Sequence, residues 1–182
     1  MEVVMPRTFL LLTFNLALNL LFAMGAGATG APKTFKAFPA QSALHLEAPD
    51  LHAGSKFWDF RTRIREGART NGVTVGGKYT LVTWGCGAPC QGGVVIDRTK
   101  SKDNIIALPV AALGYAYSFD SSLLIANPHP EEYDSTGEIP TFLYREFYQL
   151  VDGTFKFICA DKGEGTRCID EKEYNAAVNA IN

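Results

Sequence analysis

The alternation of apolar and polar residues predicts a mainly antiparallel β protein, and its clearest signal is a hairpin near the C-terminus. Two largely apolar stretches, Phe142–Val151 and Thr154–Cys159, are separated by the dipeptide Asp152-Gly153. Asp-Gly favours the two-residue type I′ turn that joins antiparallel strands. Counting outward from this turn puts large apolar side chains opposite each other on one face. The predicted pairs are Leu150 with Phe155 and Tyr148 with Phe157.

Shorter stretches with a period of two predict the other strands. In Tyr79–Trp84, the side chains of Tyr79, Leu81 and Thr83 point to one face, and those of the intervening residues point to the other. About seven short strands joined locally predict an antiparallel meander packed as a sandwich or half-barrel, within a mainly β (α+β) fold. The remaining strands are expected at Val94–Asp97, Asn104–Leu108, Ala116–Phe119 and Leu123–Ala126.

One helix is expected on each side of these strands. From Lys56 to Arg69 apolar residues recur at helical spacing, Ser55 is placed to cap the helix, and Asn71-Gly72 is placed to end it. Basic residues outnumber acidic ones along this helix, and we interpret them as a solvated face. Near the C-terminus, Asp170 is expected to cap a short helix that reaches about Ile181. The apolar residues of the first helix are Phe57, Phe60, Ile64 and Ala68.

The N-terminal residues predict a secretory signal peptide. Residues 8–24 are apolar apart from two threonines and two asparagines, and Gly25-Ala26-Gly27-Ala28 offers an A-x-A cleavage site. An uncleaved anchor is the alternative, but about 17 interrupted residues are short for a span of roughly 20. We expect a signal peptide over residues 1–28, an extended lead-in with three prolines over residues 29–54, and a single β-rich domain over residues 55–182.

Expected export changes how the four cysteines are interpreted. In an oxidising compartment Cys86, Cys90, Cys159 and Cys168 predict two disulfides, and four cysteines allow three connectivities. Their spacing favours local pairing, Cys86 with Cys90 and Cys159 with Cys168. The alternative is a zinc site, but C-x3-C with C-x8-C is poor spacing for zinc ligands. We therefore expect disulfides, and neither a metal ion nor another cofactor.

Composition and charge exclude some classes of protein but identify no binding partner. The chain has 182 residues, of which 47% are hydrophobic and 20% charged, with a formal net charge of −2. This composition excludes collagen, coiled coils and long disordered tails. The near-zero charge gives no reason to expect nucleic acid as a partner, and we expect no membrane association after signal cleavage.

The segment Trp84–Gly93, with the sequence WGCGAPCQGG, is the one candidate binding site. We interpret it as a hairpin connection closed at its neck by a Cys86–Cys90 disulfide. Glycine permits unusual backbone angles and proline restricts them. One interpretation is structural, a bridge that locks a tight reversal at a sheet edge. The other is a preorganised loop that binds at low entropic cost, with Trp84, Gly85, Gly87 and Gln91 as its contact residues.

Several motifs resemble an uncharacterised family of small exported bacterial proteins. Residues 61–68 (RTRIREGA) are similar to its R-T-x-L-R-E-x-A motif, residues 77–91 to its G-x-Y-T-I-V-x-W-G-C-G-x-x-C-Q motif, and residues 120–127 to its D-S-x-L-L-I-x-N motif. The resemblance covers about Phe57 to Ile158 and implies export and a domain type, but no activity. Gly76-Gly77 replaces an aromatic-small pair, and Cys159 with Cys168 is an addition to the pattern.

The sequence contains no complete set of catalytic residues for the enzyme mechanisms that we considered. A cysteine nucleophile needs a free thiol beside a histidine, whereas all four cysteines are expected to pair. Thiol–disulfide exchange typically uses C-x-x-C at a helix N-terminus, a setting that the 86–90 pair lacks. There is no G-x-S-x-G elbow, and spacing alone identifies no pair of carboxylates for glycan cleavage. The acidic stretch 131–138 lacks the calcium-loop pattern, and we interpret it as a solvated loop.

These observations favour a periplasmic or secreted domain of the binding or inhibitor type, with no catalytic residue assigned. Its expected partner is an envelope protein or a glycan. The alternative is an enzyme of the cell envelope, either a thiol–disulfide oxidoreductase or a cell-wall hydrolase.

Overall fold

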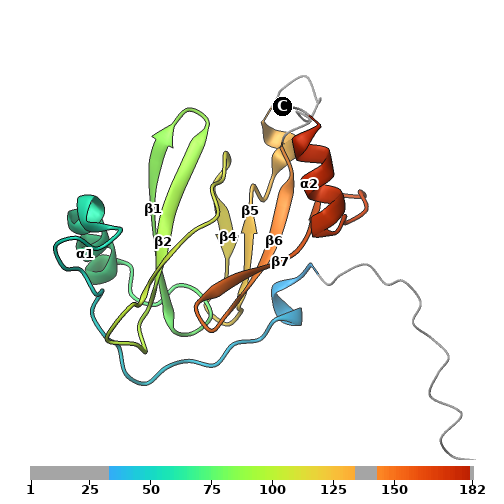
Figure 1. Ribbon diagram of the computed structural model, residues 1–182. Coiled ribbons are helices and arrows are strands. Elements are labelled where there is room, and N and C mark those ends of the chain that lie inside the picture. Colours follow the sequence, from blue (N-terminus) through green and yellow to red (C-terminus); the bar gives the residue numbers. More distant parts are fainter. Residues whose placement is uncertain (1–32, 134–142, 181–182) are drawn as a thin grey trace, which may run out of the picture.

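A computed structural model describes residues 33–133 and 143–180, so the predicted signal peptide lies outside the described residues. The described chain folds into two antiparallel sheets, a three-stranded one with the order β1-β2-β3 and a four-stranded one with the order β4-β5-β6-β7 (Figure 1). Within each sheet, every strand pairs with its neighbour along the chain, and neither sheet closes into a barrel. The expected mainly β (α+β) meander with flanking helices is confirmed.

The strand boundaries agree with the sequence pattern to within about three residues, except that β2 begins four residues before the predicted Val94. The strands are β1 (Tyr79–Gly87), β2 (Cys90–Asp97), β3 (Ile105–Ala107), β4 (Tyr115–Tyr117), β5 (Leu123–Ala126), β6 (Arg145–Val151) and β7 (Thr154–Asp161). The helices are η1 (Phe35–Ala37), η2 (Trp58–Phe60), α1 (Arg61–Thr70), η3 (Pro130–Glu132) and α2 (Glu171–Asn179). Phe142 and Ile181, two predicted element ends, lie outside the described residues.

Three clusters of buried apolar side chains stack the elements into layers. The first cluster lies between the sheets and joins Leu81 and Val95 of the first sheet to Leu124 and Leu150 of the second. The second cluster covers the other face of the first sheet with α1, and the third lies on the outer face of the second sheet. Figure 1 shows α1 beside β1 and β2, and α2 beside β6 and β7 at the opposite side.

The Asp-Gly hairpin has the register that the sequence predicts. Tyr148 pairs with Phe157 and Leu150 with Phe155, and a bulge interrupts the ladder only further from the turn. Both turn residues adopt positive φ angles, 52° at Asp152 and 79° at Gly153, as a type I′ turn requires.

The first helix differs from the sequence expectation at its start. Ser55 does not cap it, because the Ser55 hydroxyl has no hydrogen-bond partner among the described residues and a 3₁₀ turn, η2, precedes α1. Apolar residues spaced by three suit a 3₁₀ turn as well as an α-helix, so the pattern did not distinguish the two. Asn71 ends α1 as predicted. At α2 the expected cap is confirmed, since the Asp170 carboxylate accepts a hydrogen bond from the Glu173 amide at 2.8 Å.

The lead-in over residues 33–54 is hydrogen-bonded to connecting segments that adjoin both sheets. The Ala40 amide donates to the Asp120 carbonyl at 2.9 Å, and the Ala43 amide donates to the Gly77 carbonyl at 2.8 Å. Phe35 and Phe38 pack against the outer cluster of the second sheet. Figure 1 shows the lead-in passing along one end of both sheets toward α1, so it ties the layers together.

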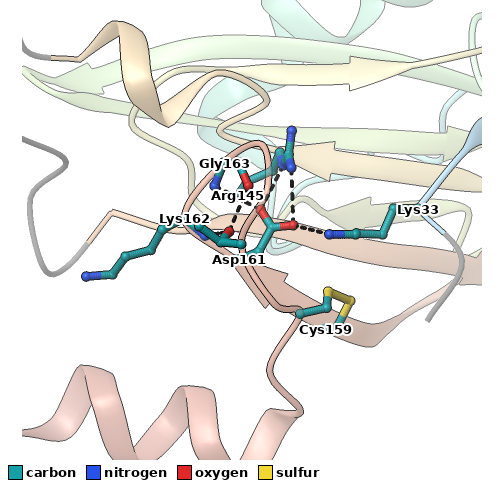
Figure 2. Close-up of a disulfide and its surroundings, with 8 residues drawn as sticks. Lys33, Arg145, Cys159, Asp161, Lys162 and Gly163 are labelled. Atoms are coloured by element: carbon teal, nitrogen blue, oxygen red, sulfur yellow. Dashed lines mark hydrogen bonds and ion pairs between the residues drawn. A yellow bond between two sulfur atoms is a disulfide. The ribbon is translucent and has the colours of Figure 1, made fainter. Parts of the chain in front are cut away.

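A buried ion pair fixes the start of the lead-in to the second sheet (Figure 2). The Asp161 carboxylate is fully buried and accepts hydrogen bonds from Arg145 Nε at 2.9 Å, Lys33 Nζ at 2.6 Å and the Gly163 amide at 3.1 Å. Burial by itself raises the pKa of Asp161, but the hydrogen bonds from Arg145 and Lys33 outweigh burial and leave this pKa below its ordinary value. The ionised carboxylate is therefore part of the folded state.

Close packing at Gly93 leads to a stability prediction. A Cβ at Gly93 would overlap the Val82 carbonyl oxygen and lie 2.8 Å from Leu108 Cδ1, so we expect Gly93→Ala to lower the free energy of unfolding by about 1–3 kcal/mol. A Cβ at the adjacent Gly92 would meet nothing closer than 3.8 Å. Gly92→Ala should therefore change the free energy of unfolding by no more than about 0.5 kcal/mol. Urea denaturation measures both, and equal effects of the two variants would contradict the packing argument.

The Asp161 ion pair leads to a prediction about pH. Asp161→Asn leaves Arg145 and Lys33 without their shared countercharge, so the free energy of unfolding should fall by about 3 kcal/mol near neutral pH. Because the pKa of Asp161 is lowered by folding, this stabilisation is present above pH 3.8 and is lost as the pH falls through the folded-state pKa.

Denaturant unfolding of both proteins between about pH 2 and 7 measures this difference. Arg167→Gln is the matched control, since it removes the exposed Arg167–Glu173 ion pair and should change stability by less than about 1 kcal/mol. A difference between wild type and Asp161→Asn that is the same at every pH would show that ionisation of Asp161 does not carry the effect.

Candidate functional site

The candidate loop is a continuation of the β1–β2 ladder, which corrects the sequence interpretation. Residue pairing runs from Tyr79↔Asp97 through Trp84↔Gly92 to Gly87↔Cys90, with a bulge at Cys86. Only the turn residues Ala88 and Pro89 lie beyond the last pair. Glycine-rich strand ends resemble a loop in the sequence, because glycine is uncommon in strand interiors. Figure 1 shows the tip of this hairpin at one end of the molecule.

The disulfides have the local pairing that the spacing favours. Cys86 and Cys90 are joined next to the hairpin turn, with Cα atoms 5.1 Å apart, and Cys159 and Cys168 are joined with Cα atoms 5.6 Å apart. The two bridges differ in accessibility, because Cys86 is exposed whereas Cys159 is buried at the end of the outer cluster. All four cysteines of the chain are thus paired. The first bridge ties the strands at the tip of the hairpin rather than the neck of a loop.

Trp84 is half-buried and belongs partly to the core. Its indole stacks on the Phe60 ring with centroids 4.5 Å apart and planes inclined by 14°, and it packs against the cluster between α1 and the first sheet. A Cβ at Gly92 would lie 3.8 Å from Cys86 Sγ and 4.0 Å from Trp84 Nε1, so the indole and the disulfide share one face of the hairpin. Phe60 is 38% exposed and forms the outer side of this stack.

The other predicted contact residues have different surroundings. Gly85 is exposed, and a Cβ added there would meet no atom within 4 Å, while Gly87 has a φ of 129°. The Gln91 backbone is hydrogen-bonded to Ala111 in both directions, at 2.6 and 2.9 Å, and its carbonyl also accepts from the Tyr115 hydroxyl. The structure thus brings Trp84 and the disulfide together at the tip, whereas the backbone of Gln91 is committed to the sheet.

Sequence analysis missed a cationic and aromatic group at Trp58, two residues before the Phe60 ring that stacks on Trp84. The guanidinium carbons of Arg61 and Arg65 lie 4.7 and 5.9 Å from the Trp58 ring centroid. Arg61 and Arg65 follow Trp58 by three and seven residues, and side chains at this spacing lie on one face of a helix. This spacing is the sequence signal that could have revealed the group. A run of charges on a helix by itself indicates only a solvated face. The stacking of the arginines on Trp58 is visible only in the tertiary structure.

One buried carboxyl group, that of Glu146, is accounted for by hydrogen bonds within the protein interior. Glu146 is 8% exposed and accepts hydrogen bonds from the Tyr148 hydroxyl at 2.5 Å and the Tyr174 hydroxyl at 2.8 Å. Burial raises the pKa of Glu146, against the opposing effect of these two hydrogen bonds. Since Tyr174 lies on α2 and Tyr148 on β6, the network fastens the C-terminal helix to the second sheet.

Acidic and histidine side chains form no candidate metal centre in the described chain. Within residues 33–133 and 143–180, no three His, Cys, Asp or Glu side chains gather as metal ligands. The acidic stretch predicted as a solvated loop is described only at residues 131–133, and the rest lies outside the described residues. In the same part of the chain, no helix has the length and hydrophobicity needed to cross a bilayer.

The different burial of the two disulfides leads to a testable order of reduction. A limiting amount of phosphine reductant should open Cys86–Cys90 before Cys159–Cys168, because thiol chemistry follows accessibility. Alkylation of the native protein followed by peptide mapping identifies the reduced pair. If residues 159 and 168 were alkylated first, the exposed position of the hairpin bridge would be contradicted.

Comparison of the chain with known protein families, curated proteins and solved structures finds no match. The resemblance to small exported bacterial proteins therefore remains a prediction from the sequence motifs.

Proposed function

We propose that the protein is an exported binding domain of the inhibitor type, and that the tip of the β1–β2 hairpin is its contact surface. The observation that carries this proposal is the exposure of a doubly constrained tip. Cys86 and Pro89 are exposed, while a disulfide and the strand ladder both restrict the backbone there.

Constraint matters for binding because a flexible loop loses conformational entropy when it docks. A loop that is already ordered loses less, so more of the contact energy appears as affinity. The turn between β1 and β2 is short, and the Cys86–Cys90 bridge links residues that are four positions apart in the sequence. Such a short ring adds less to global stability than a long one. A role in presenting the tip accounts for a bridge that adds little to the stability of the whole chain.

The position of the bridge supports binding over redox chemistry. Reactive cysteines are typically placed at helix N-termini, where the helix dipole stabilises the thiolate. Cys86 lies at a bulge in β1, and Cys90 begins β2. Neither position lies at a helix terminus, so the hairpin lacks the arrangement that is typical of thiol–disulfide exchange.

Two disulfides accord with an oxidising compartment. Together with the predicted signal peptide, they support a periplasmic or secreted location. An envelope protein or glycan is the corresponding partner class.

The binding proposal is tested by a substitution at Gly85. Gly85→Gln adds a neutral side chain where no atom lies within 4 Å, so the fold should be retained while docking at the tip is blocked. The measurement is retention of partners from a cell-envelope extract on immobilised residues 29–182. Trp84→Ala serves as a second variant, but it also removes a core contact, so its circular dichroism spectrum must match that of the wild type.

The matched control is Lys172→Glu, an exposed change on α2 at the opposite side of the molecule. We expect the wild type and this control to retain the same protein or glycan, and Gly85→Gln to lose it. Equal retention by Gly85→Gln would show that the tip is not the contact surface.

A further inference from the structure

We infer that the contact surface continues from the hairpin onto α1 and that its partner is an acidic protein surface. This inference rests on the proposed binding function and specifies the chemistry of the partner. It is carried by the stacking of Arg61 and Arg65 on Trp58 and by the stacking of Phe60, the residue before Arg61, on Trp84.

Trp58 holds two guanidinium groups. Arg61 Cζ lies 4.7 Å and Arg65 Cζ 5.9 Å from its ring centroid, and Arg61 also donates a hydrogen bond to the Trp58 carbonyl at 3.0 Å. A guanidinium stacked on an aromatic face keeps the N–H donors at its edge free. Those donors match the two oxygens of a carboxylate, and stacking reduces the entropy lost when the pair forms.

The charge on this surface is not balanced by neighbours. Ion pairs elsewhere in the described chain neutralise Lys33, Lys78, Arg145 and Arg167. By contrast, none of the cations from Lys56 to Arg69 makes an ion pair with a described residue, and the same stretch holds only two acidic residues. The cations are Lys56, Arg61, Arg63, Arg65 and Arg69. An unbalanced positive surface attracts an acidic partner and raises its rate of encounter.

The basic surface is continuous with the proposed contact surface. Phe60 ends η2 immediately before Arg61, and its ring stacks on Trp84 of β1. Trp, Phe and Arg side chains gathered around a rigid feature are typical of protein-binding surfaces, in which Trp and Arg dominate the binding energy. Trp58 and Trp84 are both half-buried, so they offer a flat platform rather than side chains that insert into a lipid bilayer. These features favour a protein carrying carboxylates.

The two tryptophans of the chain, Trp58 and Trp84, both lie on this surface and report binding directly. The probe is poly-L-glutamate, titrated against tryptophan emission at low ionic strength. We expect saturable binding that is lost as salt is raised to about 1 M, where the Debye length falls to about 3 Å. Vesicles of phosphatidylglycerol in phosphatidylcholine form a second arm.

Charge reversal tests the named residues. Arg61→Glu with Arg65→Glu should weaken poly-L-glutamate binding by about tenfold or more, and an acidic residue in the first turn of α1 favours the helix. Lys172→Glu is the control for a single charge reversal outside the surface and should bind as the wild type does. Arg65→Lys keeps the charge but loses the planar fork, so its binding should lie between that of the wild type and that of the reversed variant.

The outcomes separate this inference from the binding proposal. No binding of poly-L-glutamate, or equal binding by the charge-reversed protein, would overturn the acidic-partner inference. Stronger binding to the vesicles that is lost on charge reversal would overturn it in favour of a membrane surface. In the extract experiment, the charge-reversed protein reports on α1 and Gly85→Gln reports on the hairpin tip. Loss of extract partners in that variant, with full retention by the charge-reversed protein, would support the hairpin and overturn the role of α1.

Discussion

Burial of the β1–β2 pair on both faces is the constraint on which the rest of the structure depends. Alternate residues of these strands serve different cores: Leu81 and Val95 contact the second sheet, whereas Val82 and Val94 contact α1. A shift of register by one residue would exchange the two sets. The ladder is therefore fixed at its base, and the same register carries the Cys86–Cys90 bridge to a defined position at the tip.

The two ends of the described chain are fastened by polar contacts rather than by further core. Asp161 binds Lys33 of the lead-in and Arg145 of the second sheet, and Glu146 binds Tyr174 of the C-terminal helix. Buried carboxylates of this kind are stable only when donors surround them. Both ties lie on the second sheet, away from the hairpin side of the molecule.

The side of the molecule that carries the β1–β2 hairpin also carries α1 and its basic residues. The formal net charge of −2 is a sum over the whole chain, and it conceals a basic surface over residues 56–69 whose cations make no ion pair with a described residue. Stacking connects this surface to the hairpin, because Phe60 of η2 lies on Trp84 of β1. The proposed binding function assigns a role to the short ring, to the aromatic stack and to the two guanidinium groups on Trp58.

The sequence by itself determined the elements whose signals are local. The Asp152-Gly153 turn, the Asp170 cap, the meander and the pairing of nearby cysteines follow from backbone angles, hydrogen bonding and short chain separation. Only the tertiary structure decided that Trp84 is shared between core and surface, that Trp58 orders two arginines, and that Asp161 binds Lys33 across 128 residues. These contacts join segments distant in sequence or depend on side-chain orientation, and neither is encoded in periodicity.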